Sequence, residues 1–179
     1  MTTNPYTLQG ADDFVRLDGV CHELLREFVG WLQQEPVSLP PAEAGALTHA
    51  ADRYLREFTV DIMETGPTDA DPSLVRRYLG NWYIIHTLEP SAREMDQIAR
   101  ALDLFYQFLA ERGILDGAAA LRARAQLQDR AFYHGRLQAF WELTPDTIAA
   151  WRALDDYRRA AHGGASAAGA GGAGAAAAH

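Results

Sequence analysis

The chain has 179 residues, and 16 basic against 24 acidic side chains give it a formal net charge of −8 at pH 7. The acidity lies in residues 1–71, and a net acidic chain disfavours broad, non-specific binding to nucleic acid. The single cysteine cannot form an internal disulfide. The N-terminus lacks the basic and apolar regions of a signal peptide, and no stretch of the sequence approaches the ~20 apolar residues that span a bilayer. We therefore expect a cytoplasmic protein that makes no contact with membranes.

The first half of the chain predicts three amphipathic helices after a flexible N-terminus at residues 1–10. Apolar residues recur at three- and four-residue steps over residues 12–34 and again over residues 41–66, with a proline-rich loop between the two stretches. A third helix is expected over residues 72–89, because Asp71 is a good N-cap residue and a proline follows it.

The fourth helix has the clearest boundary signals in the sequence. Ser91 followed by Glu94 matches a capping box, in which each residue satisfies a backbone N–H group at the start of a helix. Gly113 stands where a left-handed residue commonly ends one. The apolar stripe between these positions predicts a long helix that faces the core.

The last part of the chain predicts two further helices and a disordered tail. One helix is expected over residues 117–141, although Gly135 weakens its second half. Another begins after Pro145 and fades near Ala161, and residues 163–179 contain almost only Gly and Ala, which favours disorder. No alternating pattern of β-branched residues predicts strands. The expected fold is all-α: a single compact bundle of five or six amphipathic helices over residues 11–162.

Catalytic and metal-binding motifs are missing from the sequence. No two of the six histidines stand three or four residues apart, and neither His-Glu-x-x-His nor Glu-x-x-His occurs. The sequence also lacks Gly-x-Ser-x-Gly and a phosphate-binding glycine loop. Cys21 falls on the apolar stripe of the first helix, where a buried, inert thiol is expected. We therefore predict no enzyme activity, no metal and no cofactor.

Aromatic residues gather in two parts of the sequence. Tyr78, Trp82 and His86 are four residues apart, so they share one helical face, which can either pack in the core or form a groove for a ligand or partner. A second group lies near the end of the fold, and we expect some of its rings to be exposed, as at a protein-binding surface. The candidate partner-binding residues are Trp82, His86, Tyr133, Trp141 and Trp151.

Residues 74–115 contain a helix with Tyr78-Leu79, a short turn at Pro90-Ser91 and a longer helix with Leu104-Phe105 and Phe108-Leu109. This stretch resembles the SAM-like core-binding domain of tyrosine recombinases and phage integrases. The resemblance implies a helical DNA-binding module that contacts the phosphate backbone through basic helical faces. The catalytic domain of that family carries a His-x-x-Arg motif that is absent here, so recombinase chemistry is not expected.

Two hypotheses about function follow. The first is a non-enzymatic helical interaction protein that binds a protein partner, or itself, through an exposed aromatic face. The second is a DNA-binding module like a recombinase core-binding domain, and its candidate phosphate-binding residues are Arg76, Arg77, Arg93 and Arg100. Pairing of these arginines with Glu94, Asp96 or Asp103 would argue against the second hypothesis. A small-molecule-binding bundle is a third possibility.

Overall fold

The computed structural model describes residues 5–6, 13–68 and 71–153. These residues form seven continuous helices and no strand, which confirms the all-α fold class. Their buried side chains make one connected core. None of the described helices is long and apolar enough to cross a membrane. The predicted Ala/Gly tail, most of the predicted flexible N-terminus and the end of the last helix near Ala161 lie outside the described residues.

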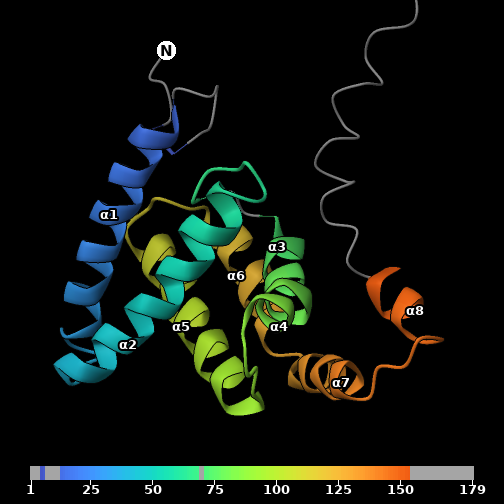
Figure 1. The fold of residues 1–179 in the computed structure, drawn as a ribbon. Coiled ribbons are helices and arrows are strands. Elements are labelled where there is room, and N and C mark those ends of the chain that lie inside the picture. The colour runs from blue at the N-terminus through green and yellow to red at the C-terminus, as the bar shows by residue number, and fades with distance from the viewer. Residues whose placement is uncertain (1–4, 7–12, 69–70, 154–179) are drawn as a thin grey trace, which may run out of the picture.

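The first two predicted helices pack against each other. Helix α1 (Asp13–Leu32) buries the expected stripe, including Leu17, Cys21 and Phe28. Helix α2 (Pro41–Asp52) begins at the expected proline and continues into the π-helical segment η1 (Arg53–Val60), a few residues short of the predicted end. In Figure 1, α1 and α2 run side by side in opposite directions at one edge of the molecule.

The third predicted helix is continuous, but it changes from α-helix to π-helix and back to α-helix. It consists of α3 (Pro72–Arg77), the π-helical segment η2 (Tyr78–Trp82) and α4 (Tyr83–His86). The Asp71 side chain accepts a hydrogen bond of 2.8 Å from the Ser73 N–H, which confirms the predicted N-cap. The helix ends at His86, where the next residue adopts an extended backbone.

Helix α5 (Ala92–Glu111) lies in the middle of the molecule, between the α1–α2 pair and the remaining helices (Figure 1). The Ser91 cap and the Gly113 end are confirmed: Ser91 Oγ accepts from the Glu94 N–H at 3.2 Å, and Gly113 has φ +67°. The other half of the predicted capping box is wrong, because the Tyr83 hydroxyl replaces the Glu94 carboxylate as the partner of the Ser91 N–H. This hydroxyl accepts from the Ser91 N–H at 3.1 Å and donates to the Glu94 carboxylate at 2.8 Å, and thereby ties α4 to the start of α5.

The prediction of a single helix over residues 117–141 is wrong. Two helices occupy this stretch, α6 (Gly117–Leu127) and α7 (Arg130–Trp141), and each begins after an aspartate that caps it. Asp129 accepts from the Phe132 N–H at 3.2 Å, and this cap starts a new helix at the break. The expected weak point, Gly135, lies inside α7. The short helix α8 (Ile148–Ala153) follows, at the edge of the molecule farthest from α1 (Figure 1).

Candidate functional site

The five candidate partner-binding residues do not share one exposed face. Trp82, Tyr133 and Trp151 are buried, with exposed fractions of 4%, 1% and 6%. The prediction that they contact a partner through a surface is therefore wrong, because other helices of the chain already cover them. His86 and Trp141 are exposed.

Trp82 and His86 belong to an aromatic stack on the third helix. The Trp82 ring lies against Tyr78 and Phe58, at centroid distances of 5.4 and 6.0 Å. His86 covers the outer side of Trp82, with ring centroids 4.5 Å apart and planes 15° from parallel, and its Nδ1 atom lies 2.9 Å from the Trp82 carbonyl oxygen. The stripe predicted from the sequence thus packs in the core, and the imidazole shields its outer end.

Tyr133 is buried where α7 crosses η2. Its hydroxyl donates to the Gln126 carbonyl at 2.9 Å, which joins α7 to the end of α6. Gly80 makes this crossing close, because a Cβ atom at that position would lie only 3.0 Å from the Phe132 ring. Gly80 permits the close crossing of α7 and η2 because it has no side chain. A pattern of apolar residues at helical spacing does not identify such a position.

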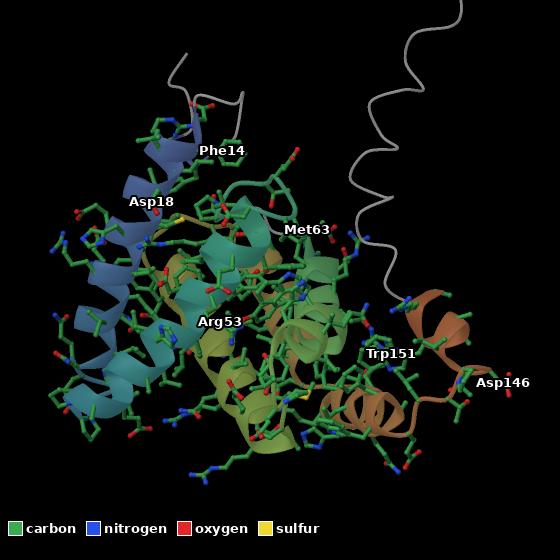
Figure 2. All side chains as sticks on the ribbon, in the orientation of Figure 1. Phe14, Asp18, Arg53, Met63, Asp146 and Trp151 are labelled. Atoms are coloured by element: carbon green, nitrogen blue, oxygen red, sulfur yellow. The ribbon has the colours of Figure 1, made fainter. Side chains whose placement is uncertain are left out.

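A buried arginine that the sequence reasoning missed holds the last two helices together. Arg136 is 6% exposed, and its guanidinium donates to the Gly80 carbonyl at 3.1 Å, to the Asn81 side-chain oxygen and to the Trp151 carbonyl at 3.2 Å. The same group lies 3.9 Å from the centre of the Trp151 ring, whose indole N–H donates to the Arg136 carbonyl at 3.2 Å. Figure 2 labels Trp151 at this junction of α7 and α8.

Trp141 is the one candidate tryptophan whose side chain is exposed at the surface. Its exposed fraction is 60%, and it packs edge-on against Phe140 at a centroid distance of 5.3 Å. Phe140 in turn contacts Trp151 at 5.6 Å. We call Phe140 and Trp141, with Trp151 beneath them, the aromatic end of α7. Within this group only Trp141 presents most of its ring to solvent, because Phe140 is half-buried.

The four candidate phosphate-binding arginines are in different surroundings. Arg76 pairs with Asp129 at 3.0 Å and lies 3.5 Å above the Phe132 ring, and Arg100 pairs with Glu43 of α2 at 2.6 Å. Arg77 is half-buried and Arg93 is exposed, and neither has an ion-pair partner among the described residues.

The partners suggested from the sequence do not hold these arginines. Asp96 instead contacts Arg130 and His134, at 3.7 and 3.0 Å, and Asp103 pairs with Arg124 at 2.9 Å. The acidic N-terminal half therefore neutralises one of the four arginines, through Glu43, and the C-terminal half neutralises another.

Cys21 lies in the core, as the sequence predicts. Its side chain is completely buried, and this burial raises the pKa of the thiol to about 12. A thiol that stays protonated at neutral pH is a poor nucleophile. In the described part of the chain, no three His, Cys, Asp or Glu side chains come together as a metal site would require.

A scan of the sequence against models of known protein families gives no match. Searches among curated proteins and among solved structures give none either. The fold and the site thus define an all-α protein with an exposed tryptophan on a packed aromatic base. The resemblance of residues 74–115 to recombinase core-binding domains stays a prediction.

Proposed function

We propose that this protein is a non-enzymatic helical interaction protein, which binds a protein partner or a second copy of itself through the aromatic end of α7. The observation that carries the proposal is the 60% exposure of Trp141. Tryptophan is enriched among the residues that contribute most to the energy of protein interfaces. The sequence offers no catalytic motif, and the proposal therefore names binding rather than catalysis.

The base beneath Trp141 supports this role because it is fixed before any partner arrives. Phe140 lies between the Trp141 and Trp151 rings. The Arg136 guanidinium holds Trp151 in place, because it donates a hydrogen bond to the Trp151 carbonyl and makes a cation–π contact with the Trp151 ring. An aromatic side chain on a rigid helix loses little conformational entropy on binding, so more of its contact energy remains as affinity.

Sedimentation velocity over a wide concentration range tests self-association. We compare the full chain with Trp141→Ser and with Leu121→Ser, a control that removes another exposed apolar side chain, 65% exposed on α6. If the protein pairs with itself, Trp141→Ser weakens the association at least ~10-fold, as loss of an interface hot spot should. The control leaves it unchanged. Equal effects of the two substitutions would rule out a specific role for Trp141 in self-association.

A protein that stays monomeric is tested for a partner by photo-crosslinking. A photoreactive residue is placed at position 141, and separately at position 121 as the control. The proposal requires a protein that crosslinks from position 141 only and binds the purified chain with an affinity that Trp141→Ser reduces. It fails if the protein is monomeric and no such partner is found.

The alternative is the DNA-binding module, supported by the two arginines without a carboxylate partner, Arg77 and Arg93. It is weaker because phosphate would have to displace Asp129 from Arg76 and Glu43 from Arg100. Fluorescence anisotropy with labelled duplex and single-stranded DNA tests it. Binding that falls steeply with salt and is lost in an Arg77→Ala/Arg93→Ala variant supports this alternative, and no binding at low salt excludes it.

A further inference from the structure

A small pocket with charged walls lies between α2 and α5. Its volume is about 210 Å³, and the two walls face each other across a floor formed by Tyr78. Figure 2 labels Arg53, where the helix that runs from α2 into η1 faces α5. The residues that line the pocket are Ala46, His49, Ala50, Arg53, Tyr78, Glu94, Gln97 and Ile98. None of them belongs to the aromatic end of α7.

The floor carries a buried polar group without a partner. Tyr78 is 0% exposed, and its hydroxyl makes no hydrogen bond among the described residues. Buried polar groups in folded proteins nearly always have a partner, and those that lack one call for an explanation. Burial raises the pKa of this hydroxyl, so the group is a neutral O–H donor at physiological pH. Tyr78 lines the pocket together with Arg53 and Glu94, and the charges of both act on the pKa of its hydroxyl.

The two walls carry opposite charges that do not neutralise each other. On one side the Arg53 Nε–H donates to the Glu57 carboxylate at 3.4 Å, and the guanidinium lies 5.7 Å from the centre of the Trp82 ring. On the other side the Glu94 carboxylate is held in place by the Tyr83 hydroxyl at 2.8 Å. The pocket therefore presents a cation, an anion and a hydrogen-bond donor toward one small volume.

The backbone around the pocket is irregular in a way that fits a binding site. Arg53 is the first residue of the π-helical segment η1, and Tyr78 is the first residue of η2. Wider π-helical turns occur often at functional sites, because they change the direction in which side chains leave the helix. Both unusual segments thus begin at a residue of this pocket.

We propose that the pocket binds a free amino acid with a short apolar side chain. Its carboxylate accepts from the Tyr78 hydroxyl and meets the Arg53 guanidinium, and its ammonium group faces Glu94. The apolar side chain lies against Ala46, Ala50 and Ile98. A carboxylic acid without an amino group leaves Glu94 facing a negative charge, and an amine without a carboxylate leaves the Tyr78 hydroxyl unsatisfied. The volume is below the ~300 Å³ at which pockets for drug-sized ligands begin, which suits a ligand of this size.

Isothermal titration calorimetry on the full chain tests the proposal with matched probes. Alanine, valine, leucine and methionine are titrated, and we expect at least one of them to bind saturably. The amino acid that binds most tightly is then compared with its own deamino acid, which lacks the amino group, and with its own decarboxylated amine, which lacks the carboxylate; for leucine these are 4-methylpentanoate and 3-methylbutylamine. Each of the two analogues should bind at least ~10-fold more weakly than the amino acid itself, because a hydrogen bond to a charged group is lost.

Two variants separate a role in binding from a role in folding. Tyr78→Phe removes only the unpaired hydroxyl, so it should leave the free protein as stable as before and weaken amino-acid binding ~10- to 100-fold. Tyr54→Phe is the matched control: it removes a buried hydroxyl that is hydrogen-bonded to the Tyr106 hydroxyl at 2.8 Å and is not part of the pocket. It should lower stability and leave binding intact. No saturable binding by any of the four amino acids, equal binding of the tightest-binding amino acid and its deamino acid, or full binding by Tyr78→Phe would each overturn the proposal.

Discussion

Raising the pH above 10 should unfold this protein in one cooperative step. Burial raises the pKa values of Tyr54 and Tyr78 above the ordinary 10.0, and it raises that of Tyr133 to about 12 and that of the Cys21 thiol to about 12. In the unfolded chain these groups lose their protons at ordinary pKa values, whereas the folded chain keeps them. The folded state then binds more protons than the unfolded state, so its stability falls as the pH rises from about 9 to about 12.

The loss can be worked out group by group. Each group that keeps its proton only in the folded state lowers the free energy of unfolding by about 1.4 kcal/mol for every pH unit above the pKa that the group has in the unfolded chain. At pH 11 the three tyrosines lie one unit above their ordinary value and Cys21 lies two units above 9.0, which together removes about 7 kcal/mol. The free energy of unfolding of a typical domain is about 5–15 kcal/mol, so a loss of this size is enough to unfold many domains.

The assay follows two signals during one alkaline titration. Tyrosinate absorbance at 295 nm reports ionisation, and circular dichroism at 222 nm reports helix content. We expect the signal of the buried tyrosines Tyr54, Tyr78 and Tyr133 to appear in a steep step that coincides with the loss of helix. Tyr78→Phe removes one of the buried groups and should move that step to higher pH. A gradual rise in absorbance centred near pH 10, with the helix signal unchanged, would refute the reasoning.

Three further predictions concern stability and reactivity. Arg136→Met removes the buried guanidinium that donates to the Asn81 side chain and to two backbone carbonyls, and should lower the free energy of unfolding by about 3 kcal/mol in urea denaturation; an unchanged midpoint would show that water replaces the guanidinium. Asp129→Ala removes the N-cap of α7 and the partner of Arg76, and should lower the free energy of unfolding by about 1–2 kcal/mol in the same measurement. Asp146→Ala is the control: this residue is exposed and has no described partner, so its replacement should leave the free energy of unfolding almost unchanged. Cys21 should react with a thiol reagent at neutral pH only as fast as the protein opens, and labelling at the rate of a free thiol would contradict its burial.

The helices that the sequence predicted well are those whose signals are local. Helix α5 has an apolar stripe, a Ser91 cap and a Gly113 end, and each of these depends only on neighbouring residues. The start of α3 at Asp71 is predictable for the same reason. The break between α6 and α7 also had a local signal, because Asp129 is a good cap, but the apolar pattern continues across it and conceals the change of direction.

The functional candidates were less predictable because exposure depends on distant parts of the chain. An aromatic residue near the end of the sequence can lie on the surface or beneath another helix, and periodicity does not distinguish the two. Trp151 is buried because Arg136 and Phe140 lie against it, and Trp141 is exposed although it is next to Phe140 in sequence. The pocket at Tyr78 was not predicted for the same reason, because its walls come from segments that are far apart in sequence.

The attachment of α8 has a consequence for how the protein opens. Trp151 is the only side chain of this six-residue helix that is buried, and its contacts converge on Arg136 and Phe140. Segments with few buried apolar contacts open at a lower free energy than the whole molecule. Helix α8 should therefore exchange its amide hydrogens and admit proteases while α1 and α5 stay closed. Its release would remove the Trp151 ring from Phe140, so the packing beneath Trp141 depends on the attachment of α8.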